Sequence, residues 1–398
     1  MKMITIKKNI LFASVFLNSI CSFAQQSSIA SPDKQKEITS EVELSNDALI
    51  IIKNAYRPLV LKTWKQSQIK LTVHASQDDQ SKTTDNELLV KSGILAKLNN
   101  NIFTIESNSN LNDPPNQSNK GGNRPLILFI PEGHNVEIQN KYANIQVLSK
   151  FKQLKVDISN GNLETKTLEH LILNSKYSDF DGGDIKNAEI SFYNGHFRAK
   201  NIENLNIYSE TSYIFADTVK KSVIKSINDD YEFTNAESIE CNKRFNVLKV
   251  DNLSSSIQID GLNADITIKK FLPTVTLIAI KNKYSSLRLP IENLQNYALD
   301  FEGVYSKILG DFERTPVPID HVIPDEPVPI HGVVVRNSVK RPDLKIDTTK
   351  IATVDSEDNN ETSDNTQTKD PVKFVAKKGT GKNTRITVNC YNCRIDFR

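Results

Sequence analysis

Cysteine is scarce in this sequence, and its scarcity excludes a small fold built on disulfide bonds. Only Cys21, Cys241, Cys390 and Cys393 occur among 398 residues, whereas disulfide scaffolds are short chains with many paired cysteines. Long apolar runs are missing as well. Residues 10–20 form a short apolar stretch, far below the roughly 20 residues of a transmembrane helix, and no later segment approaches that length. The sequence therefore predicts no transmembrane segment beyond its start.

Neither sign of charge is in clear excess. Lysine and arginine number 50 and aspartate and glutamate 48, which gives a formal net charge of +2, and the two signs are interspersed. Proteins that bind nucleic acids usually carry a basic patch or stripe. We therefore expect no nucleic-acid partner.

The first 24 residues have the layout of a secretory signal peptide. A lysine-rich start precedes the apolar stretch, and the small residues Ser22 and Ala24 stand before a cleavage point ahead of Gln25. A lipid-anchored Cys21 is the alternative, but the bulky Ile20 stands where a lipoprotein signal has a small residue. We therefore predict cleavage after Ala24 and export to the periplasm or the cell surface.

An internal repeat with a spacing of 17 residues dominates the middle of the chain. Three columns of mostly apolar residues recur through six units, while the positions between them are mainly Asn, Ser, Lys, Glu and Asp. The columns are Val156, Leu173, Ile190, Ile207, Ile224 and Cys241; Leu163, Phe180, Phe197, Ile214, Tyr231 and Leu248; and Leu168, Ile185, Ile202, Val219, Ala236 and Leu253. Such a fixed period is typical of solenoid proteins.

The local pattern inside each unit is that of a strand. Apolar residues alternate with polar ones, as at Leu154, Val156 and Ile158. Asn-Gly pairs at 160–161 and 194–195 mark turns, because both residues tolerate a positive φ. We therefore predict an all-β fold, a single β-solenoid of about 17-residue coils with parallel strand ladders and two short strands in each coil.

One coil alone would not be stable, which explains why the unit repeats. Burying four or five column side chains contributes on the order of 10 kcal/mol, and ordering the coil costs at least as much. We therefore interpret the columns as core that stacking completes. The register slips at Gln258, where the neighbours Ile257 and Ile259 are the apolar residues, so we expect a coil of altered length there.

A second pattern recurs outside this repeat, with Asn and Tyr two positions apart and alternating apolar residues after them. Its tyrosines are Tyr56, Tyr142 and Tyr284. We interpret it as a turn followed by an inward-facing strand, with each Tyr packed on a corner of a coil. An aromatic binding platform is the alternative.

Composition shifts divide the chain into six parts. Residues 311–372 begin with a proline-rich stretch and continue as an almost wholly polar, acidic one, which is typical of an extended and then disordered insertion. The predicted parts are a signal peptide at 1–24, a disordered linker at 25–40, a strand-rich N-terminal β region or cap at 41–135, the solenoid repeats at 136–310, the insertion at 311–372 and a C-terminal strand pair at 373–398.

Three segments resemble a family of exported bacterial β-solenoid proteins known as putative adhesins, whose function is unknown. The first, KNAYRPLVLKTW, ends at Trp64; the second, LILFIPEGHNVEIQNKYANIQV, contains Pro131; and the third, KKGTGKNTRITVNCYNCRIDF, closes the chain. The family has Gly after the motif tyrosine, where this chain has Arg57 or Ala143. The resemblance implies a β-solenoid fold and export rather than an activity. We expect, in addition, a non-enzymatic protein with an adhesin-like binding role or a structural role in the cell envelope.

No catalytic, cofactor-binding or metal site is predicted. The histidines, at positions 74, 134, 170, 196, 321 and 331, show no metal-ligand spacing, and no nucleophile or phosphate-loop motif occurs. Asp179, Asp181 and Asp184 surround a Gly-Gly pair, which we interpret as a turn, with a calcium loop as the alternative. A carbohydrate-active β-helix enzyme of the envelope is the alternative function, and it would need paired carboxylates.

Cys390 and Cys393 are candidates for a disulfide bond. Apolar residues change parity between them, so both face inward only if the chain turns at Tyr391 and Asn392. A straight strand would hold them about 10 Å apart, beyond the roughly 7 Å that a disulfide spans, whereas a corner brings them together. Export supplies an oxidising compartment. Cys241, in an apolar column, is predicted to stay a buried free thiol.

The sequence leaves the ligand open. An envelope protein or a glycan is the expected partner of a binding module, because repeat proteins bind on their extended faces. Aromatic side chains grouped on one face would favour binding, and a uniform Lys, Glu and Asn face would favour a structural role. Outside the columns the local aromatic excess is Tyr193, Tyr208 and Tyr213.

Overall fold

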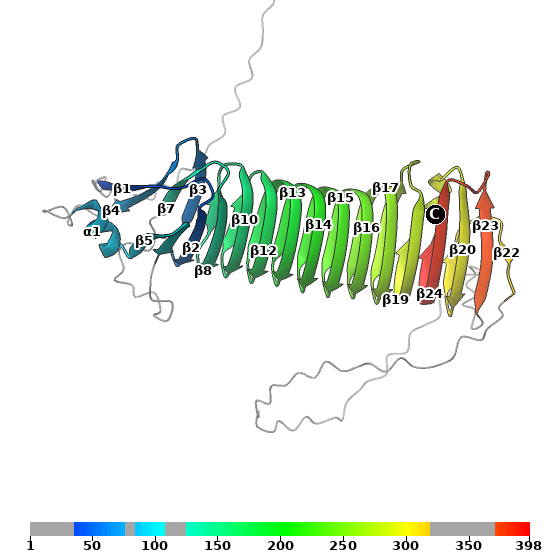
Figure 1. Ribbon diagram of the computed structural model, residues 1–398. Coiled ribbons are helices and arrows are strands. Elements are labelled where there is room, and N and C mark those ends of the chain that lie inside the picture. Colours follow the sequence, from blue (N-terminus) through cyan, green and yellow to red (C-terminus); the bar gives the residue numbers. More distant parts are fainter. Residues whose placement is uncertain (1–35, 76–83, 108–124, 319–370) are drawn as a thin grey trace, which may run out of the picture.

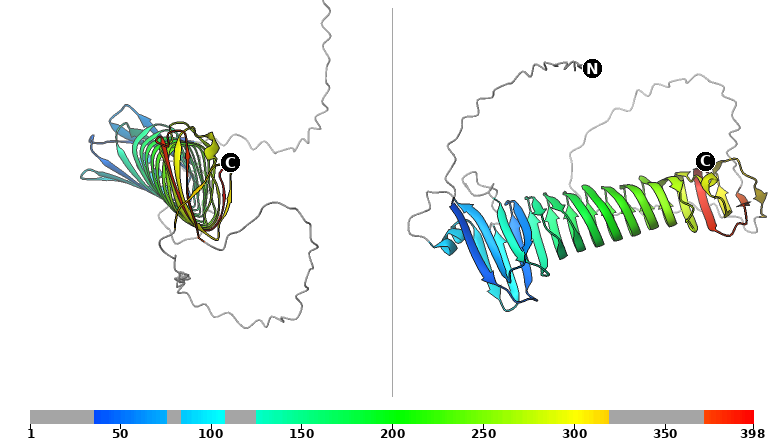
Figure 2. Two further views of the ribbon diagram at one scale, coloured as in Figure 1. Left: turned by 90° about the vertical axis from the view of Figure 1, so that its right-hand side faces the viewer. Right: turned by 90° about the horizontal axis from the view of Figure 1, so that it is seen from above.

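The computed structural model describes residues 36–75, 84–107, 125–318 and 371–398. In these ranges the strands stack along one axis into a long solenoid (Figure 1), and the coils superpose as a flattened loop when viewed along that axis (Figure 2). The all-β solenoid predicted from the repeat is confirmed. None of the helices in the described ranges has the length and apolarity needed to cross a bilayer.

The middle of the solenoid is built from parallel ladders with the predicted spacing. Phe180 pairs with Phe197, Phe197 with Ile214 and Ile214 with Tyr231, each 17 residues further along the chain. The strands here are β10 (Phe151–Ser159), β11 (Asn162–Thr165), β12 (Leu168–Lys176), β13 (Asp179–Tyr193), β14 (His196–Glu210), β15 (Tyr213–Ile227), β16 (Asp230–Arg244), β17 (Val247–Leu262) and β18 (Asp265–Phe271).

Coils β13 to β16 differ from the prediction of two short strands each. Every one of them is a single 15-residue strand, because neighbouring coils hold the ladder on both sides of each interruption. In β13 the ladder skips Gly183 and Lys186, and a Cβ on Gly183 would lie 2.1 Å from the Lys166 carbonyl oxygen. The Gly-Gly turn that we predicted is therefore a bend inside a strand.

The opposite corner of each coil contains the predicted Asn-Gly pairs, but their two residues have different roles. Asn160 and Asn194 both have φ 55° and take the left-handed conformation, whereas the glycine after each of them does not. The glycines let neighbouring coils approach, since a Cβ on Gly161 would lie 2.0 Å from the carbonyl oxygen of Ala143. The positive φ that we expected for both residues is thus confined to Asn.

The Asn-Tyr pattern marks the same corner in coils nearer the ends. Tyr56, Tyr142 and Tyr284 have φ of 61°, 57° and 55°. The Asn two positions before each tyrosine points inward and donates a hydrogen bond to a backbone carbonyl. Asn140 Nδ2, for example, donates to the Ala143 carbonyl oxygen at 2.6 Å. Asn54 does the same to the Arg57 oxygen at 2.7 Å. The pattern is therefore a corner followed by an inward-facing strand.

The apolar columns form one continuous core, as the repeat predicted. Ile207 is 2% exposed and Cys241 3% exposed. The predicted slip is an irregularity between β16 and β17 that inserts one residue, so that Cys241 pairs with Ile259 and Gln258 pairs with the outward-facing Glu240. The outward position of Gln258 is the consequence of that insertion.

At both ends of the solenoid the order of the strands in the stack differs from their order in the sequence. The last strand, β24 (Thr384–Asp396), lies between β19 (Leu277–Arg288) and the coil formed by β20 (Tyr297–Val304) and β21 (Lys307–Leu309) (Figure 1). Antiparallel strands β23 (Val372–Lys378) and β22 (Thr315–Pro316) close this end. The chain end is thus a bent strand within the stack, next to the short 3₁₀ turn Ile291–Asn293.

The N-terminal end has the same arrangement. Strands β2 (Leu49–Ala55) and β3 (Leu59–Trp64) lie between β8 (Asn135–Lys141) with β9 (Ile145–Val147) on one side and β6 (Ile102–Ser107) with β7 (Leu126–Pro131) on the other. The remaining elements of this end are β1 (Lys36–Glu43), β4 (Gln68–Ala75), β5 (Ile94–Asn99) and the short helix α1 (Asp85–Lys91).

Two predicted boundaries are corrected. Strand β1 begins at Lys36, inside the range given to a linker, because its Ile38 is fully buried against β4. The insertion likewise begins with described structure, since Thr315 and Pro316 pair with β23. The predicted signal peptide at 1–24, the linker up to residue 35 and residues 319–370 of the insertion lie outside the described residues.

Candidate binding surface at the corner of the coils

The left-handed corner residues form a column along one edge of the solenoid. Each corner N–H donates to a carbonyl of the next coil: Tyr177 N to Tyr193 O at 2.9 Å, and Asn194 N to Glu210 O at 3.1 Å. Successive corners are therefore one strand spacing, about 4.8 Å, apart. In spatial order the column reads Tyr142, Asn160, Tyr177, Asn194, Thr211, Asn228, Phe245, Asn263 and Tyr284.

Among the tyrosines of this column, Tyr177 is the one whose ring has, within the described residues, no aromatic packing partner that would explain a tyrosine at a left-handed corner. A left-handed conformation costs an ordinary residue roughly 1–2 kcal/mol, whereas Asn tolerates it. Tyr142 stacks on Tyr56 with ring centroids 5.0 Å apart, and Tyr284 packs on Tyr391 at 5.4 Å. Tyr177 is 64% exposed and contacts no ring among the described residues. Its ring is available to a ligand.

A trough of about 710 Å³ follows this edge. Three consecutive residues from each of the corners at Tyr177, Asn194 and Thr211 line it, and Asn162 and Asn246 lie at its two ends. Gly195, Thr211 and Ser212 are among the small members of its lining. Across five coil spacings it runs for roughly 24 Å.

Uncommitted amide groups distinguish the trough from the rest of the surface. The side-chain amides of Asn194, Asn228 and Asn246 are exposed, and none of them hydrogen-bonds to another described residue. Each amide offers one acceptor oxygen and two donor hydrogens. The edge therefore presents a row of neutral groups that can donate and accept.

The charged and aromatic groups of the trough are held in place by one another. His196 Nδ1 lies 3.0 Å from Asp179 Oδ1, and its ring centroid is 6.2 Å from that of Tyr213. The Tyr213 hydroxyl donates to Glu232 at 3.1 Å. Burial, with this hydrogen bond, raises the pKa of Tyr213, so its hydroxyl stays protonated at neutral pH. Apart from Asp179 and Asp230 the lining has no Asp, Glu, Lys or Arg.

The structure separates the tyrosines that the sequence grouped. Tyr193 and Tyr208 lie together, with ring centroids 5.8 Å apart, whereas Tyr213 lies across the corner beside His196. Tyr208 donates to Glu210, and this bond raises its pKa to about 12. Sequence analysis missed Tyr177 as a site residue, although the 17-residue period, applied to outward positions, places it in line with Asn194.

The acidic cluster in β13 does not converge on one point. Asp179 accepts from His196, and Asp184 accepts from Asn201 Nδ2 at 2.7 Å in the next coil. Within the described ranges no three His, Cys, Asp or Glu side chains are grouped as metal ligands. His134 lies between the carbonyls of Pro131 and Ser45, while His321 and His331 fall outside those ranges.

A buried polar network lies directly beneath the trough. Asp229 is fully buried and accepts hydrogen bonds from Ser209 and Ser226 hydroxyls at 2.7 and 2.8 Å, and from the Ser212 backbone N–H at 2.7 Å. Lys243, also fully buried, donates to Ser226 at 3.2 Å and to the Asp229 carbonyl. This network fixes the backbone on which the corner residues Thr211 and Asn228 stand.

Burial shifts the acid–base properties of this network. It raises the pKa of the Asp229 carboxyl, although the serine hydrogen bonds oppose the shift, and it lowers the pKa of Lys243. The neighbouring Tyr231, whose hydroxyl lies 2.5 Å from Ser209, has its pKa raised by burial. None of these groups opens onto the surface, so we assign them to stability.

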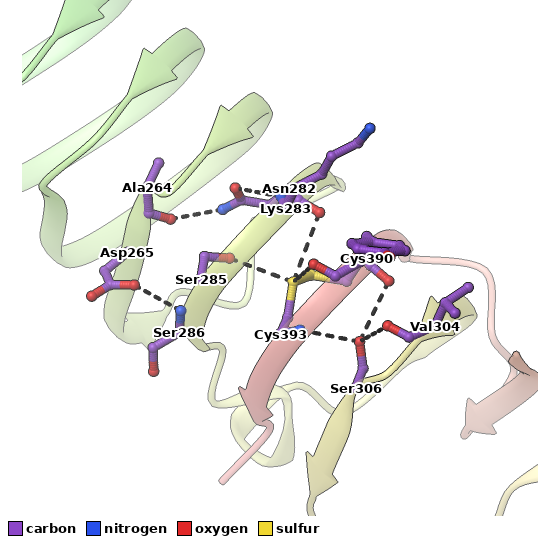
Figure 3. Close-up of a disulfide and its surroundings, with 11 residues drawn as sticks. Ala264, Asp265, Asn282, Lys283, Ser285, Ser286, Val304, Ser306, Cys390 and Cys393 are labelled. Atoms are coloured by element: carbon purple, nitrogen blue, oxygen red, sulfur yellow. Dashed lines mark hydrogen bonds between the residues drawn. A yellow bond between two sulfur atoms is a disulfide. The ribbon is translucent and has the colours of Figure 1, made fainter. Parts of the chain in front are cut away.

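The two cysteines of the last strand lie at the corner of β24. A disulfide joins Cys390 and Cys393, Asn392 between them has φ 53°, and both cysteines are buried (Figure 3). The backbone N–H of Cys393 donates to Ser306 Oγ at 3.3 Å. The bridge therefore lies between the coils of β19 and β20.

We expect mass spectrometry of the unreduced protein, expressed from Gln25 onward, to find this bridge and one thiol. That thiol is Cys241, and burial raises its pKa to about 12, so it should react with iodoacetamide far more slowly in the folded protein than after unfolding. Three alkylated cysteines, or a bridge that includes Cys241, would contradict the expectation.

The chain matches no protein-family model and no curated protein. Among solved structures, it is similar to a putative adhesin from Parabacteroides merdae, with 14% identity and a TM-score of 0.33 over 62% of this chain and 97% of the other. A putative cell adhesion protein from Clostridium sporogenes matches at 10% identity and a TM-score of 0.20, over 91% of this chain and 98% of the other.

A third solved structure, a putative lipid binding protein from Parabacteroides distasonis, is 10% identical with a TM-score of 0.31, over 62% of this chain and 97% of the other. The first two of these proteins are thus named for adhesion, and the third is named for lipid binding.

Proposed function

We propose that this protein is an exported, non-enzymatic, adhesin-like binding protein that holds its ligand in the corner trough. The observation that carries the proposal is the row of uncommitted Asn amides beside the exposed ring of Tyr177. Stacked coils form a rigid scaffold, so little ordering is needed when a ligand binds. The signal-like start supports export.

The carboxylates of the trough argue against glycoside hydrolysis. Asp179, His196, Tyr213 and Asp230 occupy equivalent positions in four successive coils, which places the two carboxylates about 14 Å apart along the axis. Glycosidases hold theirs roughly 5–9.5 Å apart. The trough is therefore better suited to binding a ligand than to cleaving a glycan.

The flat face formed by the second halves of the coils has a different character. Lysine and glutamate pair across neighbouring coils there, as where Lys155 lies 3.3 Å from Glu137. A depression on this face is shared by Asp157, Asn174 and Glu189. Ile172 and Tyr208 also line this depression, so the face is mixed in character rather than uniformly Lys, Glu and Asn.

The test is capture of ligands from envelope extracts and on a glycan array by the immobilised protein. We expect Tyr177→Asn to lose the captured ligand, because Asn suits the left-handed corner but removes the ring. Tyr142→Asn is the matched control, since Tyr142 is also a left-handed corner tyrosine and is 53% exposed, but lies outside the trough. Equal capture by the wild type and both variants would mean that the ligand binds outside the trough, and no capture by any of the three would favour the structural role.

A further inference from the structure

We infer that the ligand of the trough is a neutral oligosaccharide, laid along the solenoid axis from the corner of Tyr177 toward Asn246. The inference rests on the proposed function and adds the chemical class of the ligand. It follows from three properties of the lining: its hydrogen-bonding groups, its rings and its charge.

The hydrogen-bonding groups match a chain of hydroxyls. A hydroxyl donates one hydrogen bond and accepts others, and each Asn amide can do both. Asn194 and Asn228 stand two coils apart at the same corner position, about 9.6 Å along the axis. Asp179 and Asp230 add carboxylate oxygens, which accept from hydroxyls. A linear polymer with hydroxyls along its length can engage these groups in sequence.

Aromatic rings provide apolar contact surface at one end of the trough and along one of its walls. The Tyr177 ring projects from the corner with 64% of the residue exposed. Tyr213 and His196, with ring centroids 6.2 Å apart, form the wall beside Asn194. Aromatic rings offer flat apolar faces, onto which the C–H face of a sugar ring packs, while the sugar hydroxyls stay free to meet the amides.

The charge of the lining excludes anionic ligands. No Lys or Arg lines the trough, and its two formal charges are carboxylates. Phosphate, sulfate and uronate groups are normally bound by Arg or Lys. An anionic polymer would face Asp179 and Asp230 without a compensating cation.

The backbone of the corner excludes recognition of an extended peptide by strand pairing. That mode needs an open strand edge with free N–H and C=O groups. The corner N–H groups of Asn194, Thr211 and Asn228 already donate to the next coil, at 3.1, 3.0 and 2.8 Å. The trough must therefore recognise its ligand through side chains, which is how it would bind a glycan.

Isothermal titration calorimetry of the purified protein tests the inference. The probes are short neutral oligosaccharides of glucose, mannose and N-acetylglucosamine, with a uronate oligosaccharide and a lysine-rich peptide for comparison. We expect a neutral oligosaccharide to bind, and Tyr177→Asn and Asn228→Ala each to weaken it by about tenfold or more. Tyr142→Asn should leave its affinity unchanged. Melting curves confirm that every variant is folded.

The failures of the two proposals are distinguishable. Capture of an envelope protein, an anionic glycan or the lysine-rich peptide that is lost in Tyr177→Asn would overturn the neutral-glycan inference but keep the trough as the binding site. Neutral-glycan binding that survives both trough variants would overturn both proposals for this surface. Absence of neutral-glycan binding by the wild-type protein would overturn the inference alone.

Discussion

Replacing Ile207 with Asp should destabilise the protein by about 4 kcal/mol or more, because the change buries an unpaired charge. Ile207 is 2% exposed and pairs with Ile190 in the coil before it and Ile224 in the coil after it. The carboxylate would have apolar neighbours on both sides. We expect the melting temperature to fall by roughly 10 °C.

Asn206→Asp is the matched control for this prediction. Asn206 is the adjacent residue of the same strand, but it is exposed and pairs with Glu189 and Val223. The same new charge on the outer surface stays in water, opposite Glu189, and should change the free energy of unfolding by at most about 1 kcal/mol. Similar shifts for the two variants would mean that Ile207 does not occupy the core column.

The repeat predicted the middle of the fold because burial constrains inward positions. Each coil covers the next, so Ile190, Ile207 and Ile224 meet the same neighbours and the same steric limits. Even the slip at Gln258 could be located, because the apolar residues moved by one position. Alternation of apolar residues therefore located the columns, although it did not distinguish one bent strand from two short ones.

The order of the strands at the two ends could not be predicted in the same way. Ile386 of β24 pairs with Ile278 of β19 and with Leu299 of β20, and apolar strands of this kind would fit any neighbour in the stack. The order of coils depends on contacts between segments far apart in the chain. No local pattern at Thr384 or Leu49 specifies which neighbours they take.

The corner trough escaped prediction because outward positions are not constrained by packing. Tyr177 lacks the Asn two positions earlier that marks Tyr142, since Ser175 stands there, so the Asn-Tyr pattern did not include it. Tyr213 was noticed only as a neighbour in sequence of Tyr208. The structure shows that the relevant neighbours of Tyr213 are His196 and Asp230, each one coil away.

Replacing Asp229 with Ala should cost about 3–5 kcal/mol, because it removes one member of a buried charged network. The change leaves Ser209, Ser226 and the Ser212 N–H without their acceptor, and it removes one of the two carboxylates that interact electrostatically with the buried Lys243. Thermal or denaturant unfolding measures the loss. Asp217→Ala, at an exposed position of β15, should be within about 0.5 kcal/mol of the wild type.

A double-mutant cycle with Lys243→Met then separates two effects of Asp229→Ala, the loss of the Asp229 hydrogen bonds and the loss of its charge near the Lys243 ammonium. In Asp229→Ala the Lys243 ammonium stays buried and keeps Asp230 as its remaining nearby carboxylate, whereas in the double variant the ammonium is gone. The double variant should therefore lose less stability than the sum of the single ones, by about 1–3 kcal/mol. Additive losses would show that Asp229 and Lys243 act independently.

The pH dependence of Lys243→Met provides a second measurement of the same network. Asp229, Asp230, Cys241 and Tyr231 surround the ammonium, but burial dominates and lowers the pKa of Lys243 below its ordinary 10.5. A lowered pKa in the folded state means that this group contributes stability at pH values above 10.5, and the contribution is lost as the pH falls through the folded-state pKa. The wild type should therefore gain stability relative to Lys243→Met as the pH is raised toward 10.5. A stability difference that does not change with pH would contradict burial of a charged Lys243.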